Sequence, residues 1–75
     1  MTAPVPSQIR VSFESRHGWT VRRDGWEMPL SSHGTQAGAE RSGRLLAQRE
    51  RASFFVHGFE GKVIRTESYA PAKAT

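Results

Sequence analysis

The chain has no cysteine, so neither a disulfide bridge nor a thiolate metal site can form. The absence of cysteine also favours a reducing compartment. No apolar run approaches the roughly 20 residues that span a bilayer. The segment MTAPVPSQIR lacks the basic and apolar regions of a secretory signal. We therefore expect a soluble cytoplasmic protein that does not associate with membranes.

Large apolar side chains are scarce as well. Only about a dozen of them can form a core, which is close to the lower limit for independent folding. A chain of 75 residues cannot supply two separate cores. The sequence therefore predicts one domain, residues 8–69, between disordered tails of residues 1–7 and 70–75 that contain proline and small residues.

Charge is unevenly distributed between the two signs. Eleven Lys and Arg residues against seven Asp and Glu residues leave a net charge of +4, and nine of the cations are arginine. The planar guanidinium makes paired hydrogen bonds to phosphate or carboxylate and stacks on bases, which the ammonium of lysine does not. The composition favours an anionic partner, with the plain solubility of a small domain as the alternative explanation.

Alternation of apolar and polar side chains predicts a β-hairpin in the first third of the chain. Residues 8–15 read QIRVSFES, in which Ile9, Val11 and Phe13 alternate with polar residues, as in a half-buried strand. Gly18 can take the positive φ that a tight turn needs, and residues 19–23 return as the second strand. The side chains predicted to face the core are Ile9, Val11, Phe13, Trp19 and Val21.

The segment after this hairpin has weaker signals. Asp24-Gly25 is the strongest two-residue turn signal in the chain. Residues 26–30 form at most a short strand at the sheet edge, because Pro29 cannot donate a hydrogen bond to a neighbouring strand.

One helix is predicted, with Thr35 as its N-cap and residues 36–51 in its body. Spacing of 100° per residue defines two faces. The predicted packing face contains Gly38, Ala39, Ser42, Leu45 and Leu46, and the opposite face contains Glu40, Arg41, Arg44, Gln48 and Arg51.

A second hairpin closes the chain, with strands in residues 53–58 and 62–68 joined by a glycine turn. Phe54, Val56 and Ile64 are its predicted inward side chains. The predicted fold is therefore α+β: an antiparallel sheet of four strands, or five with residues 26–30, and one helix on one face, in the order β-β-α-β-β.

Several short motifs together resemble a bacterial family, domain of unknown function 2188. The motifs are a Trp-x-Val strand, a Thr-x-x-x-Ala helix start, a Gly-Arg-x-Leu-Ala helix centre, and a His-Gly-x-x-Gly turn followed by Ile and Ser-Tyr. In this chain they fall on Trp19, Val21, Thr35, Ala39, Gly43, Arg44, Leu46, Ala47, His57, Gly58, Gly61, Ile64, Ser68 and Tyr69. Gly38 departs from the family pattern, as does the ending APAKAT. The resemblance implies a small two-hairpin α+β fold and brings no established activity.

Strand alternation also predicts which side chains lie on the sheet face away from the helix. Arginine, aromatic and histidine side chains gather there, as on sheets that stack bases and contact phosphates. The helix arginines add a second basic stripe. The residues predicted to bind nucleic acid are Arg10, Arg22, Phe55, His57, Arg65, Arg41 and Arg44.

Two other function classes remain open. Phe55 and Val63 can instead form an apolar patch for a second copy of the chain or another protein. His57 is the best candidate for catalysis, but the interpretation that we favour is that its ring bonds a nearby backbone carbonyl and holds the turn. The histidines lack metal-ligand spacing, and GFEGK lacks the pattern of a phosphate loop. We expect no enzymatic activity, no cofactor and no metal, and no small-molecule substrate can be named.

Overall fold

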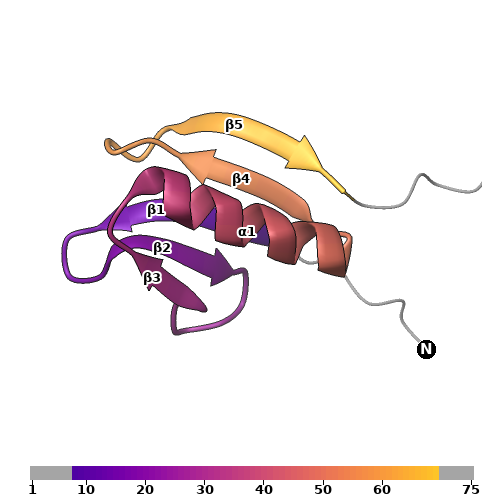
Figure 1. Ribbon diagram of the computed structural model, residues 1–75, viewed down its shortest axis with the longest axis horizontal. Helices are drawn as coiled ribbons and strands as arrows, with labels where there is room; N and C mark the ends of the chain where they lie inside the picture. The colour runs from indigo at the N-terminus through magenta and orange to yellow at the C-terminus, as the bar shows by residue number, and fades with distance from the viewer. Residues whose placement is uncertain (1–7, 70–75) are drawn as a thin grey trace, which may run out of the picture.

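The computed structural model describes residues 8–69, which form a five-stranded sheet with one helix (Figure 1). The elements, in chain order, are β1 (Gln8–Glu14), β2 (Gly18–Arg23), β3 (Ser31–His33), α1 (Gln36–Glu50), β4 (Ser53–His57) and β5 (Val63–Ser68). The α+β class is confirmed, whereas the order is β-β-β-α-β-β. The predictions for residues 1–7 and 70–75 lie outside the described residues.

The sheet is mixed, so the prediction of an entirely antiparallel sheet was wrong. Its strand order is β3-β2-β1-β4-β5, and β1 pairs with β4 in parallel, with Ile9 beside Phe54. The other three pairings are antiparallel. The direction follows from the connection: α1 carries the chain back along the sheet, and a helical crossover is what a parallel pair needs. Alternation of side chains holds no information on strand direction.

The third strand lies further along the chain than predicted. Residues 26–30 are irregular, and β3 begins only at Ser31, after Pro29. The backbone N–H of Leu30 donates to the carbonyl of Val21 at 2.7 Å and leads the chain into the pairing with β2. β3 is short and lies at the edge of the sheet, where a nearby proline is tolerated.

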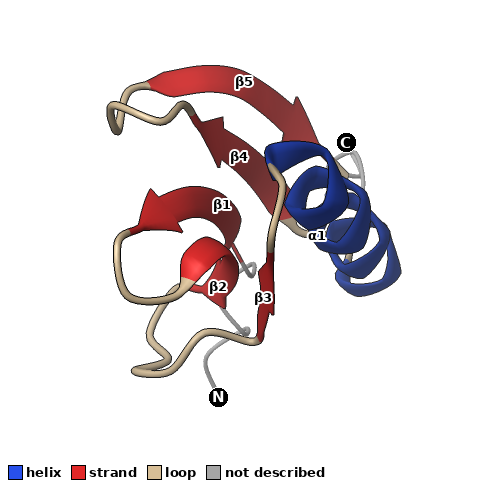
Figure 2. Ribbon diagram, turned by 60° about the vertical axis from the view of Figure 1, so that its left-hand side comes forward, coloured by secondary structure: helices blue, strands red, loops and turns tan. Residues whose placement is uncertain are grey.

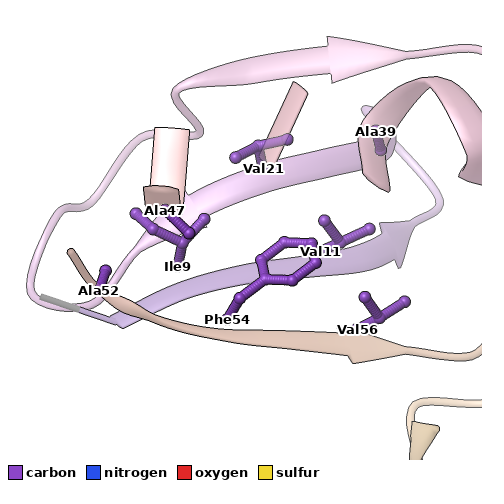
Figure 3. Close-up of a cluster of buried hydrophobic side chains, with 8 residues drawn as sticks. All are labelled: Ile9, Val11, Val21, Ala39, Ala47, Ala52, Phe54 and Val56. Carbon is purple, nitrogen blue, oxygen red and sulfur yellow. The ribbon is translucent and has the colours of Figure 1, made fainter. Parts of the chain in front are cut away.

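The core is a thin layer between the sheet and α1 (Figure 3). Phe54 is its largest side chain and has no exposed surface. The inward direction predicted for the apolar residues of β1, β2 and β4 is confirmed for all but Phe13. The Phe13 ring packs against the rings of Trp19 and Phe59 instead of joining the core. The buried apolar residues are Ile9, Val11, Val21, Ala39, Ala47, Ala52, Phe54 and Val56. Three of the eight are alanine, so most of the buried area comes from the sheet.

Thr35 caps α1 as predicted, accepting a hydrogen bond from the backbone N–H of Gly38 at 3.0 Å. Successive residues of a helix are rotated by about 100° around its axis. On this scale the buried face of α1 is rotated by roughly a quarter turn from the face that the sequence predicted. Its buried residues are Ala39, Gly43 and Ala47, whereas Leu45 is 61% exposed. The helix approaches the sheet so closely that only small residues can face it.

The orientation of β5 was also predicted wrongly. Arg65 and Glu67 lie on the side of α1, where they bind Glu40 and Arg44, and Ile64 is exposed rather than buried. A register shift between Val56 and His57 changes the alternation of this strand. Because β5 is an edge strand beside the flank of α1, its inner side chains meet charged helix residues instead of the core.

Candidate nucleic-acid interface

One face of the sheet has α1 packed on it, and the opposite face, the outer face, has no element of residues 8–69 packed on it (Figure 2). Strand alternation and register assign its side chains. The outer face contains Arg10, Ser12, Glu14, Thr20, Arg22, Phe55, His57 and Thr66. Most of these side chains are only half-buried, so a ligand can reach this face.

Arg10 occupies the centre of the outer face. It stands in register between Arg22 of β2 and Phe55 of β4, and its guanidinium carbon lies 4.7 Å from the centroid of the Phe55 ring. Its Nε donates to Oδ1 of Asp24 at 2.9 Å, and its Nη2 donates to Oε1 of Gln8 at 3.2 Å. The cation is therefore held against an aromatic ring, with one carboxylate partner at the surface.

His57 holds the turn between β4 and β5. Its Nδ1 lies 2.9 Å from the carbonyl oxygen of Gly61, which can only accept, so Nδ1 is the donor. Its Nε2 lies 3.3 Å from Nη1 of Arg10, which can only donate, so Nε2 accepts. Both partners select the same neutral tautomer. Of the two interpretations of His57, the geometry matches the one in which its ring bonds a backbone carbonyl.

Arg22 is already neutralised by a carboxylate on the same face. Its Nε and Nη2 donate to the two oxygens of Glu14 at 2.5 and 2.7 Å, and the hydroxyl of Thr20 donates to the same carboxylate at 2.9 Å. The hydrogen bonds from Arg22 lower the pKa of Glu14 to about 2, against the opposing effect of burial. Because its charge is balanced by Glu14, Arg22 adds little positive potential to the outer face.

The structure divides the seven predicted site residues between two sides of the sheet. Arg10, Arg22, Phe55 and His57 come together on the outer face. The helix side carries the other three, Arg41, Arg44 and Arg65. Of these, Arg44 binds Glu67 at 3.0 Å and Arg65 binds Glu40 at 2.6 Å.

Asp24 and Gln8, whose side-chain oxygens accept hydrogen bonds from Arg10, were not among the predicted site residues. Asp24 was recognised only as a turn residue, and Gln8 only as the start of a strand. Within residues 8–69, no group of three or more His, Cys, Asp or Glu side chains could hold a metal ion. No helix in the same part of the chain is long and apolar enough to cross a membrane.

Comparison with protein-family models gives a match over most of the chain. The model of a family described as an uncharacterized protein conserved in bacteria (DUF2188) matches residues 9–69. No curated protein and no solved structure matches the chain. The matched range contains nearly every residue of the fold, and it confirms the resemblance seen in the sequence.

Proposed function

This chain belongs to DUF2188, a family of uncharacterised bacterial proteins, and we propose that it is a non-enzymatic module that binds single-stranded nucleic acid on the outer face of its sheet. The observation that carries the proposal is the place of Arg10. Its guanidinium lies over the Phe55 ring at the centre of the outer face. Sheets that bind single strands combine aromatic rings with cations, and a base can stack on the plane of a guanidinium as well as on a ring.

The ion pair of Arg10 does not prevent this role. The side chains of Arg10 and Asp24 are 36% and 47% exposed, and pairs this exposed contribute only about 0–1 kcal/mol. A phosphate can therefore replace the Asp24 carboxylate at little cost. Arg16 and Lys62, in the turns that follow β1 and β4, have no ion pair within residues 8–69. Because β1 and β4 are parallel, both cations lie at the same end of the sheet and extend its positive potential.

We expect a labelled oligonucleotide, as single-stranded DNA or RNA, to bind at low salt and to lose affinity steeply as salt increases, because bound counterions are released. Arg10→Ala should weaken binding about tenfold. It should also reduce the logarithmic salt slope by about 0.7 for each phosphate that the variant no longer neutralises. Fluorescence anisotropy across a salt series measures both quantities.

Arg41→Ala is the matched control. It removes the same charge from the opposite side of the sheet, where Arg41 is exposed on α1, and it should change affinity only slightly. Absence of binding at low salt, or an equal loss of affinity for Arg41→Ala and Arg10→Ala, would contradict the proposal.

Self-association through β5 is the second candidate function. The patch expected from Phe55 and Val63 is reduced, since Arg10 lies over the Phe55 ring. Val63 and Ile64, however, are 49% and 60% exposed on an edge strand with no neighbour on its outer side in the described sheet. Such edges pair with other strands. We expect light scattering to show a dimer, and we expect Ile64→Lys to dissociate it. A monomer at about 100 µM, well above a micromolar dissociation constant, would rule out this candidate.

A further inference from the structure

A groove of about 730 Å³ lies between α1 and the strands β2 and β3, on the helix side of the sheet. Figure 1 shows β3 at the edge of the sheet beside α1. Sites for small molecules in proteins have volumes of about 300–1,000 Å³ and mostly apolar linings with a few polar groups. The groove has the size of such a site, and its lining decides which class of ligand it can hold.

The apolar part of the lining comes from both walls of the groove. Val21 of β2 and Leu30, which precedes β3, lie on one wall, and Leu45 and Leu46 of α1 lie on the other. Leu30 and Leu46 are partly buried against the core, whereas Leu45 is 61% exposed. An apolar group that enters the groove covers these side chains, and removal of apolar surface from water favours binding.

The charge of the groove comes from two arginines, Arg23 and Arg49. Arg23 is already paired, because its Nε and Nη2 donate to the two carboxylate oxygens of Glu50. Arg49 has no carboxylate within ion-pair distance in residues 8–69. No acidic side chain lines the groove in the same part of the chain. One positive charge is therefore left for the anionic group of a ligand.

The cation and the apolar lining lie on the same flank of α1. Because successive residues are rotated by about 100°, Ser42, Leu46 and Arg49 fall within about 60° of one another around the helix. All three line the groove. Ser42 and Arg49 are about 10 Å apart along the helix axis, at about 1.5 Å per residue. An extended chain of single bonds advances about 1.2 Å per bond, so about eight bonds cover this distance.

We infer that this groove binds one molecule of a medium-chain carboxylic acid, as its anion, from solution. The carboxylate contacts Arg49, and the alkyl chain lies along Leu45, Leu46 and Leu30. The groove is on the helix side of the sheet, whereas Arg10 and Phe55 are on the outer face. Carboxylate binding and nucleic-acid binding are therefore separable by mutation.

The test titrates the full, ¹⁵N-labelled chain with sodium octanoate and follows the backbone amide shifts. The largest shifts should occur at Val21, Leu30 and Leu46, which line the groove. From butanoate to octanoate, affinity should rise by up to about fourfold for each methylene, because each one leaves water. The rise should level off beyond about ten carbons, where an extended chain is longer than the groove.

Two variants separate the charged contact from the apolar one. Arg49→Gln should weaken octanoate binding by about three- to fivefold, near the upper limit for an exposed ion pair, and should leave the affinity for 1-octanol unchanged. Leu45→Ser should weaken the binding of both ligands, and the fold should persist, because Leu45 is exposed.

Arg41→Gln is the matched control for the charged contact. It removes the same charge from α1 at an exposed residue that does not line the groove, and it should leave octanoate affinity unchanged. Arg10→Ala should also leave octanoate affinity unchanged, although it weakens the binding of oligonucleotides.

The inference is overturned if octanoate and decanoate cause no amide shifts at about 10 mM, where a millimolar site is about nine-tenths occupied. It is also overturned by shifts that lie outside the groove, by an affinity that does not depend on chain length, or by equal losses for Arg49→Gln and Arg41→Gln. Octylammonium or 1-octanol that binds as tightly as octanoate would contradict an anionic ligand. Groove amides that shift on dilution without ligand would show that a second copy of the chain covers the groove instead.

Discussion

Phe54→Ala is expected to lower the free energy of unfolding by about 3–5 kcal/mol, the usual cost of truncating a fully buried phenylalanine. Phe54 is the largest of the buried side chains and has no exposed surface. Small domains of this size rarely have more than about 3–5 kcal/mol of stability from a single core. The variant should therefore be largely unfolded at 25 °C, as far-ultraviolet circular dichroism would show.

Phe55→Ala is the matched control, because it removes the same side chain from the next residue of β4. Phe55 is half-buried on the outer face and contacts Arg10 rather than the core, so this variant should remain folded. Phe54→Leu keeps most of the apolar volume and should cost about 1.5 kcal/mol or less, which gives a measurable urea transition. Similar destabilisation by Phe54→Ala and Phe55→Ala would show that the core is not where the structure places it.

Gly43→Ala is expected to destabilise the protein even though alanine is the better helix former. A Cβ at position 43 would lie 2.9 Å from Cε1 of Phe54 and 3.0 Å from Cγ2 of Val11. Overpacking of this kind costs about 1–3 kcal/mol, whereas the gain in helix propensity is only about 1 kcal/mol. We expect a net destabilisation of up to about 2 kcal/mol, measured as a lower urea midpoint.

The control is Gly34→Ala, the same substitution where a Cβ meets no atom within 4 Å and φ is not in the left-handed region. This variant should be as stable as the parent or slightly more stable, because alanine restricts the unfolded chain. If Gly43→Ala raised the urea midpoint by as much as Gly34→Ala, close contact between α1 and the sheet at Gly43 would be ruled out.

Local patterns in the sequence predicted local structure well. The alternation in residues 8–15 and 19–23 identified β1 and β2 and their inward residues, and Thr35 identified the start of α1. Gly18 adopts the positive φ, 78°, that its turn needs. Each of these features depends on a few adjacent residues, whose sterics and hydrogen bonds are nearly the same in any fold.

The candidate site was predicted only in part. Alternation correctly placed Arg10 and Phe55 on one face, because they belong to strands whose opposite face is clearly apolar. It failed for Arg65, because β5 has no residue buried in the core that would show which of its alternating side chains face inward. A register shift also interrupts the pairing of β5 with β4. It also failed to connect Arg10 with Asp24, which lies fourteen residues away in the chain.

The sequence by itself determined the number of domains expected, the inward face of three strands and the helix cap, because periodicity and capping act within one element. Only the tertiary structure decided that β4 runs parallel to β1, that α1 turns Gly43 rather than Leu45 toward the sheet, and that β5 turns Arg65 and Glu67 toward α1. These choices depend on how closely a helix with small residues can approach Phe54 and Val11, and on which charged side chains then come within reach of one another.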